Sequence, residues 1–448
     1  MNEIDISFSK GQKRIALQVL IAFALAILIG SLLLNLPQMI VKEGRINYID
    51  ALFTATSSIC VTGLIVQDTP TYFTTLGKAL ILLMIQTGGL GIMTVTSIFG
   101  LMLGRQIYIK DKYYLSSTFG SKRTFSPPRF ILLVALTTFA IELIGMIILS
   151  SRFYFYYDYP LRASLYLGLF HSISAFNNAG FALFSNSMET FVADIPINII
   201  MMVLIIIGGI GYPVLSEILT RGRRKKFSLH AKIIFVTTVF LILLGAVMFF
   251  LMEFNNMDSI GTFSLGNKVM TSFFQSVTAR TAGFNTVNTG SLTQATLFFI
   301  TILMFIGASP GSTAGGIKTT TFAAITLGGL SALKGRKNVL IFKKRIPDSI
   351  VTRALAITLT GILLVVLATL GVMLFEKSSA MEALFEVISA FGTVGLSTGI
   401  TMGLTTGSKI ILILVMFIGR IGISVLGLVL AFRTKIEKVS RPEETINL

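Results

Sequence analysis

Four short segments of this 448-residue chain each contain a glycine that is followed by leucine or phenylalanine. They read "SSICVTGLIV" (57–66), "SAFNNAGFAL" (174–183), "SVTARTAGFNT" (276–286) and "SAFGTVGLST" (389–398), and we call them the glycine loops. The glycines, here named the ring glycines, are Gly63, Gly180, Gly283 and Gly395. Because they lie about a quarter of the chain apart, they predict a duplicated unit and a pseudo-fourfold structure.

The chemistry expected of such loops is coordination of a monovalent cation. Glycine permits dihedrals that other residues disfavour, so an extended loop can turn its carbonyl oxygens toward one axis. Carbonyl oxygens can replace the hydration shell of a cation, and the loops offer no ring of Asp or Glu for a divalent ion. The residues expected to line the site are Val61, Thr62, Gly63, Asn178, Ala179, Gly180, Thr281, Ala282, Gly283, Thr393, Val394 and Gly395.

The elements that must position these loops are membrane helices. The chain is 53% hydrophobic and 13% charged, with a mean hydropathy of +0.83, which excludes an ordinary soluble domain. Four units each hold a long apolar span, a short apolar segment, a glycine loop and a second long span. The first spans are 15–36, 130–151, 229–252 and 350–375, and the second are 79–103, 195–220, 292–332 and 408–432. The short segments are 48–59, 162–176, 267–279 and 380–391.

These short segments are too short to cross the membrane as helices, so we expect them to enter and return on one side. The fold class predicted is therefore an all-α integral membrane protein. Its eight transmembrane helices form four units of first helix, pore helix and second helix around one ion pore. The units cover 1–110, 111–226, 227–340, which contains a broken second span, and 341–448.

Basic residues gather in the segments between the units. The net charge is +17, and the segments concerned are 1–14, 104–129, 221–232, 333–353 and 433–448. An excess of Lys and Arg marks the cytoplasmic side, which predicts a multi-pass protein with both termini in the cytoplasm. Attraction to anionic membrane lipids accounts for such runs better than binding to nucleic acid does.

One second span is interrupted by "GASPGSTAGGIKTTT" (307–321). The stretch 292–332 is long enough to cross the membrane about twice as a continuous helix, and its proline and glycines favour a break. Backbone N–H and C=O groups that lose their helix partners at the break must face water or protein, so we expect the stretch to form a gate across the ion path. The alternative is a passive helix kink. The predicted gate comprises Ser309, Pro310, Gly311, Ser312, Thr313, Ala314, Gly315, Gly316, Ile317 and Lys318, together with Arg420 in the last span.

The sequence also predicts structural roles for several other charged and reactive side chains. Lys318 is expected either to repel cations in a closed state or to anchor the loop to an acid. Glu142 is expected to pair with a basic residue, and Arg280 to brace its loop against a carboxylate or carbonyls. Cys60 is the only cysteine, so neither an intrachain disulfide nor a cysteine metal cluster is possible.

The glycine loops, "TARTAGFNT" (278–286) and the interrupted span resemble the membrane subunit of the Ktr/Trk/HKT superfamily of potassium transporters, most of all its bacterial Ktr type. The resemblance covers nearly the whole chain. It implies potassium uptake through a channel-like pore at the cell membrane, and Gly63 matches the potassium-preferring pattern. It also implies a homodimer on a cytosolic ring of nucleotide-binding regulatory subunits, an arginine near the cavity at Arg420, and ATP or ADP bound in the partner. Sodium as an activator stays open.

Two alternatives were weighed against this reading. A cation-coupled secondary carrier, with Na⁺ or H⁺ symport, is disfavoured because the repeats are parallel and only one span of eight is expected to be strongly broken. A membrane enzyme or an ATP-driven pump is disfavoured because the chain holds no metalloprotease motif and no nucleotide site.

Overall fold

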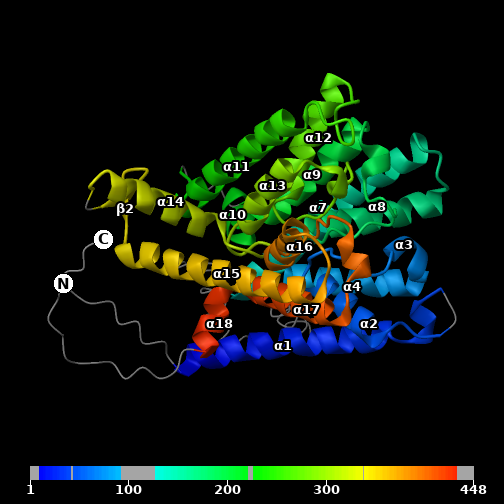
Figure 1. The fold of residues 1–448 in the computed structure, drawn as a ribbon, viewed down its shortest axis with the longest axis horizontal. Coiled ribbons are helices and arrows are strands. Elements are labelled where there is room, and N and C mark those ends of the chain that lie inside the picture. The colour runs from blue at the N-terminus through cyan, green and yellow to red at the C-terminus, as the bar shows by residue number, and fades with distance from the viewer. Residues whose placement is uncertain (1–9, 42–43, 92–126, 220–225, 337, 431–448) are drawn as a thin grey trace.

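The computed structural model describes residues 10–41, 44–91, 127–219, 226–336 and 338–430. The protein is mostly helical (Figure 1). The segments 1–14, 79–103, 104–129, 221–232, 333–353 and 408–432 expected from the sequence lie partly outside the described residues, and 433–448 lies wholly outside them.

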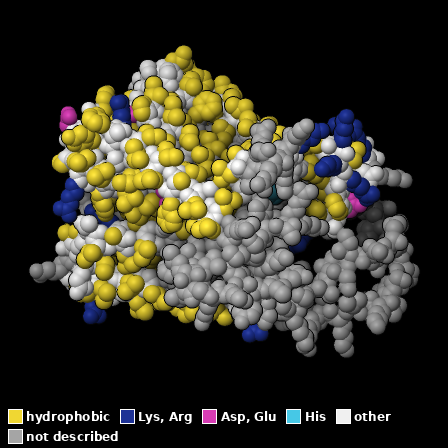
Figure 2. Space-filling view, turned by 180° about the vertical axis from the view of Figure 1, so that it is seen from behind, with side chains coloured by type: hydrophobic (Ala, Val, Ile, Leu, Met, Phe, Trp, Pro, Cys, Tyr) yellow, Lys and Arg dark blue, Asp and Glu magenta, His cyan; other side chains and the backbone are white. Residues whose placement is uncertain are grey.

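Four long helices match the predicted first spans. They are α1 (Lys10–Leu34), α7 (Pro127–Phe155), α11 (Leu229–Glu253) and α15 (Asp348–Phe375). Among the described residues, these four helices are long and apolar enough to cross a membrane, or five spans are found if one bent pair is counted. No more than a third of each apolar stretch is buried, so most of its surface is left for lipid. Figure 2 shows apolar side chains over the middle of one face.

Each long helix is followed by a shorter one that leads into a glycine loop. These helices are α2 (Tyr48–Ile59), α8 (Leu161–Phe176), α12 (Leu265–Thr278) and α16 (Ala380–Gly392). Polar caps begin three of them, because the side chains of Asn47, Ser264 and Ser379 accept hydrogen bonds from the first turn. Ser379 and Glu382 form a complete capping box.

The second apolar segments are α4 (Thr75–Leu90), α9 (Ile195–Ile210) with α10 (Tyr212–Leu219), α13 (Gln294–Phe305) with α14 (Thr319–Leu333), and α17 (Thr406–Ile421) with α18 (Ile423–Leu430). The expectation of a single broken span is wrong. The pair α9 and α10 bends by 100° at Gly211, and α17 ends at Gly422 before α18 begins. Both glycines have a positive φ, 96° and 87°, which an α-helix cannot continue through.

A small hairpin was not predicted and corrects the all-α assignment. Strands β1 (Val339–Ile341) and β2 (Lys344–Ile346) pair antiparallel, with Val339 opposite Ile346. Phe342 and Lys343, the turn residues, both have a positive φ, as in the tight turns that favour hairpins. The buried face of the hairpin packs near the ends of α11, α14 and α15. Figure 2 shows Lys and Arg gathered at this end of the molecule.

Short elements complete the fold and lie in the connections between the helices. They are α3 (Thr69–Tyr72) and the 3-10 helices η1 (Pro37–Met39), η2 (Glu189–Phe191), η4 (Thr289–Ser291) and η5 (Ile400–Gly403).

Candidate functional site

The backbone follows the same path in all four glycine loops. Two residues before each ring glycine, a residue with a side chain has a positive φ, which is uncommon outside glycine. These residues are Val61 (56°), Asn178 (58°), Thr281 (74°) and Thr393 (50°). The ring glycines have φ values of 95°, 71°, 80° and 94° in chain order. Strained backbone of this kind persists only where the surrounding structure enforces it, and it is concentrated at functional sites.

The ring glycines meet one another in chain order. A carbon added at Gly63 would lie 2.9 Å from Cα of Gly180, and one added at Gly180 would lie 3.1 Å from Cα of Gly283. A carbon added at Gly283 would lie 3.1 Å from Cα of Gly395, and one added at Gly395 would lie 2.9 Å from Cα of Gly63. The contacts therefore close a ring, and no side chain fits at these positions without displacing backbone. Four separate segments of the chain are thus brought together at the ring glycines.

Four carbonyl oxygens take part in the same contacts. An added carbon on each ring glycine would touch the carbonyl of the residue that precedes the next ring glycine. In ring order these carbonyls belong to Ala179, Ala282, Val394 and Thr62. The N–H groups of the same residues donate at 2.8 or 2.9 Å to carbonyls at the end of their short helix. Within the described residues no hydrogen bond is donated to these four carbonyls.

The residues expected to line the ring carry no negative charge. None of the twelve lining residues is acidic, and the described chain holds no group of three His, Cys, Asp or Glu suited to a metal ion. Arg280 lies in the third glycine loop and is 7% exposed. Its Nε has no hydrogen-bond partner among the described residues, so the expected brace is not made through that atom.

Residues 307–318, which we call the span-break loop, separate α13 from α14. The loop leaves and returns at one point, because Ile306 pairs with Ile317 in an isolated parallel bridge. The N–H of Ile317 donates to the carbonyl of Phe305 at 3.2 Å, and Thr319 donates to Ala308 at the same distance. The ten residues of the predicted gate therefore form a closed excursion of the chain and not a simple kink.

This loop lies against the ring. The N–H of Gly315 donates to Oγ1 of Thr393, a residue of the fourth glycine loop, at 3.0 Å. Thr313, which is fully buried, donates through Oγ1 to the carbonyl of Gly208 at 3.3 Å. On the other side, Tyr212 donates through its N–H to the carbonyl of Gly311 at 3.0 Å. The span-break loop thus connects the fourth glycine loop with the bend between α9 and α10.

Two cationic side chains hold the loop. Arg420 donates through Nη1 to the carbonyl of Thr313 and through Nη2 to the carbonyl of Gly88 at the end of α4. Lys318 donates through Nζ to the carbonyl of Ala314 at 2.6 Å. The partners of Lys318 are carbonyls of its own loop, so the expected anchor to an acid is wrong. Arg420 joins the first, third and fourth units at one point.

Comparison with known proteins identifies the family. The sequence pattern of the TrkH family, described as cation transport proteins, matches residues 12–440. The chain belongs to the TrkH family. The resemblance to the Ktr/Trk/HKT superfamily that the glycine loops indicated is therefore confirmed.

Relatives and a solved structure agree with this membership of the TrkH family. The chain is 41% identical over 402 residues to the Ktr system potassium uptake protein B of Bacillus subtilis, covering 90% of this chain and 89% of the relative. It is 34% identical over 446 residues to the potassium/sodium uptake protein NtpJ of Enterococcus hirae, covering 98% of each. The crystal structure of the potassium transporter TrkH from Vibrio parahaemolyticus superposes with a TM-score of 0.73 at 20% identity. It covers 96% of this chain and 87% of that chain, which supports the TrkH fold.

As a TrkH-family protein with several long apolar helices, the chain is a multi-pass membrane protein.

Glu142, buried in α7, was expected to pair with a basic residue. In the described structure its side chain instead accepts from two amides, Gln86 Nε2 at 3.1 Å and Asn177 Nδ2 at 2.9 Å. The expectation of a basic partner is therefore not met, and Asn177, next to the second glycine loop's Asn178, is tied to α4 and α7.

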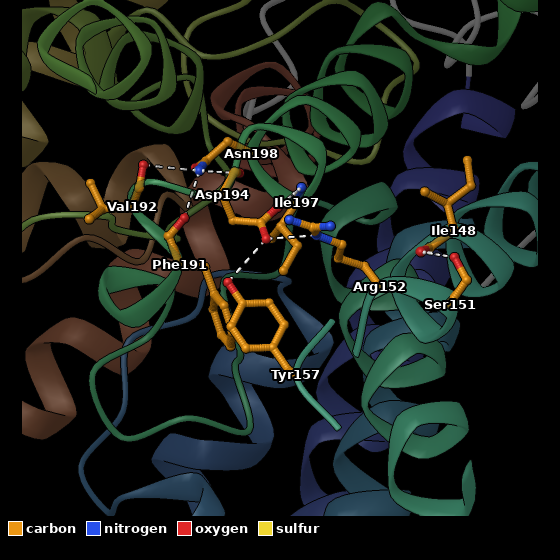
Figure 3. A network of polar contacts seen from close by, with 9 residues as sticks. All are labelled: Ile148, Ser151, Arg152, Tyr157, Phe191, Val192, Asp194, Ile197 and Asn198. Atoms are coloured by element: carbon orange, nitrogen blue, oxygen red, sulfur yellow. Dashed lines mark hydrogen bonds and ion pairs between the residues drawn. The ribbon is translucent and has the colours of Figure 1, made fainter. Parts of the chain in front are cut away.

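Sequence reasoning missed polar contacts that hold the ends of several helices. Figure 3 shows one of them, in which Asp194 begins α9 and accepts from Arg152 Nε at 2.8 Å and from the Tyr157 hydroxyl at 3.0 Å. Burial and the bond to Asp194 raise the pKa of Tyr157 to about 12. A second contact joins the fourth and first units, where Lys409 Nζ lies 2.7 Å from Asp50 Oδ1. No local signal in the sequence pairs residues so far apart.

Proposed function

We propose that this chain takes up potassium ions across the cell membrane through a pore whose selectivity filter is the ring of glycine loops. The observation that carries the proposal is the cyclic contact of Gly63, Gly180, Gly283 and Gly395, with four carbonyls beside them to which no described residue donates a hydrogen bond. The names of the relatives from Bacillus subtilis and Enterococcus hirae support the choice of ion.

The fold that this function requires is eight membrane helices in four units of first helix, pore helix and second helix, with the unit boundaries given above. In this arrangement α2, α8, α12 and α16 enter the membrane and end at the filter. Their C-terminal ends carry partial negative charge, which favours a cation at the ring. Neutral carbonyls then hold a monovalent ion without the desolvation cost of acidic side chains.

We propose that the span-break loop, with Arg420, is the gate of this pore. What supports the proposal is its place against Thr393 and its attachment to three other elements through Thr313, Gly311 and Arg420. Flow of ions requires these hydrogen bonds to break, so movement of α14 or α10 would open the path. Serine, threonine and backbone groups close it.

Regulation is proposed to come from a second subunit. Relatives named as protein B of a Ktr system support a multi-component assembly. We propose that a homodimer of this chain rests on a cytosolic ring of nucleotide-binding subunits, which would hold the ATP or ADP. The exposed basic side chains of the hairpin, Lys343, Lys344 and Arg345, provide a surface for an acidic rim. With this face and both termini in the cytoplasm, the positive-inside rule is satisfied.

Ion flux into proteoliposomes tests the function. The purified chain, with and without the regulatory partner, is expected to carry K⁺ down its gradient faster than Na⁺. The alternative is a secondary carrier, and its test is the same preparation with an imposed Na⁺ or H⁺ gradient. Potassium accumulation driven by that gradient, against its own, supports the carrier and contradicts a channel-like pore.

A further inference from the structure

Two buried side chains occupy equivalent places on two of the short helices. His171 on α8 lies nine residues before Gly180, and Glu386 on α16 lies nine residues before Gly395. Each accepts a hydrogen bond from the N–H of the residue three positions beyond its ring glycine. Since the ring contacts run in chain order, the second and fourth units face each other across the ring. The two side chains therefore hold opposite sides of it.

Glu386 holds the segment that leaves the fourth glycine loop. Its side chain is fully buried. Oε1 accepts from the N–H of Thr398 at 2.9 Å, from the hydroxyl of Ser397 at 2.7 Å and from the hydroxyl of Thr398 at 3.2 Å. Oε2 accepts from the hydroxyl of Thr401 at 2.6 Å. Four donors converge on one carboxylate, which accepts without donating, so the chain just beyond Gly395 is fixed to α16.

His171 does the same for the second glycine loop with a different side chain. It is also fully buried, and its Nε2 accepts from the N–H of Leu183 at 3.2 Å. Nδ1 lies 2.8 Å from the carbonyl of Leu167, so the hydrogen bonds assign the proton to Nδ1. The imidazole of His171 stacks on the aromatic ring of Phe184, with the two ring centroids 5.1 Å apart. The stacking and the hydrogen bonds of both ring nitrogens therefore fix the orientation of the imidazole.

Among the described residues, neither the first nor the third unit makes this contact. The equivalent residue of the first unit, Thr54, donates its hydroxyl to the carbonyl of Asp50 on its own helix at 2.8 Å. The third glycine loop is one residue longer, and either register places a phenylalanine, Phe273 or Phe274, at the equivalent position. Beyond its ring glycine, the buried hydroxyl of Thr286 has no partner in the described chain. The second and fourth units, on opposite sides of the ring, thus share this contact.

We propose that His171 and Glu386 are positioning residues that fix the spacing of the carbonyl ring and thereby determine the preference for potassium over sodium. The inference rests on the proposed function and adds to it the residues that set selectivity. Discrimination between the two ions depends on where the carbonyls are held, whether cavity size or the number of ligands dominates. Releasing the segments beyond Gly180 and Gly395 lets opposite sides of the ring move inward, toward the geometry that suits the smaller ion.

The test compares K⁺ and Na⁺ flux of variants in proteoliposomes. Glu386→Gln exchanges Oε2, the acceptor for the Thr401 hydroxyl, for a donor, and His171→Phe removes the acceptor for the N–H of Leu183. Each is expected to lower the K⁺-to-Na⁺ flux ratio about fivefold, the factor expected from one lost hydrogen bond. His171→Gln retains an acceptor and is expected to recover most of the ratio. Glu253→Gln is the matched control, because Glu253 is fully buried and also accepts four hydrogen bonds, from Ser259, Asn256 and twice from Thr293. It lies at the end of α11, away from the glycine loops, so its ratio is expected to equal that of the wild type.

The possible outcomes distinguish a failure of this inference from a failure of the proposed potassium uptake. A wild-type protein that carries no K⁺ rejects the proposed function. A selective wild type with unchanged ratios in Glu386→Gln and His171→Phe overturns only the positioning role, as does an equal fall in Glu253→Gln. Thermal unfolding of each purified variant is measured in parallel. If Glu386→Gln does not fold, the comparison of His171→Phe with His171→Gln decides the matter.

Discussion

Replacement of Gly63 by serine is the perturbation whose effect the structure specifies most closely. The φ of Gly63 is 95°, a conformation that costs a residue with a side chain about 1–2 kcal/mol. The added carbon would also lie 2.6 Å from the carbonyl oxygen of Ala179 and 2.9 Å from Cα of Gly180. Both neighbours are backbone of the next glycine loop, so the ring itself has to move by several tenths of an ångström to restore ordinary contact.

Gly44 offers a control that separates strain from displacement of the ring. It lies in the connection between η1 and α2, its φ is 119°, and an added carbon there would meet nothing within 4 Å. Gly44→Ser is therefore expected to strain the backbone in a similar way and to leave the ring unaltered. Any effect of strain on folding or membrane insertion appears in both variants, whereas an effect on ion preference belongs to Gly63→Ser alone.

The assay is the ratio of K⁺ to Na⁺ flux into proteoliposomes of matched protein content. Gly63→Ser is expected to lower this ratio about tenfold, which corresponds to a loss of about 1.4 kcal/mol of discrimination. Gly44→Ser is expected to keep the wild-type ratio. An unchanged ratio in Gly63→Ser, in protein that folds and carries ions, would refute the claim that the ring glycines shape the ion site. An equal fall in both variants would assign the effect to strain.

Other changes test the gate, the helix caps and the docking surface. Deletions within 310–316 remove part of the span-break loop and are expected to raise partner-free K⁺ flux and weaken nucleotide control. Unaltered flux and control in a folded deletion variant would remove the gate assignment. Arg420→Gln breaks the contacts with the carbonyls of Thr313 and Gly88 and is expected to raise partner-free flux in the same assay, with wild-type flux as the contrary result. Ser379→Ala removes a capping-box residue of α16 and is expected to cost about 1 kcal/mol of stability, read from thermal unfolding in detergent, whereas an unchanged unfolding temperature would contradict that cost. Neutralising Lys343, Lys344 and Arg345 together is expected to weaken pull-down of the regulatory ring and its salt dependence, and wild-type binding at all salt concentrations would exclude docking there.

The ring of glycine loops could be predicted because the same sequence pattern occurs four times in the chain. Four glycines at regular spacing, each after a short apolar segment, identify the same local structure four times. The long first helices were also predictable, since uninterrupted apolar runs of that length leave few alternatives. By contrast, the bends at Gly211 and Gly422 lie inside apolar runs, where a single glycine does not differ from a packing glycine.

The remaining misses concern contacts between residues far apart in the chain. Nothing local to Glu142 indicates that its partners are Gln86 and Asn177 rather than a basic side chain. The hairpin was hidden because basic residues dominate 333–353, although Val339, Ile341 and Ile346 are the apolar residues that bury one face. The role of His171 could not be predicted, because the N–H that it accepts from belongs to Leu183, beyond the glycine loop, and no local pattern pairs the two.

The most direct measurement of the central claim is anomalous diffraction from the protein crystallised in Rb⁺, a heavier substitute for K⁺. The ring predicts an anomalous peak within coordination distance of the carbonyls of Thr62, Ala179, Ala282 and Val394. Replacing Rb⁺ by Na⁺ is expected to abolish that peak. Ordered density for the four glycine loops with no Rb⁺ at their carbonyls, or with the ion bound elsewhere in the membrane region, would contradict the account.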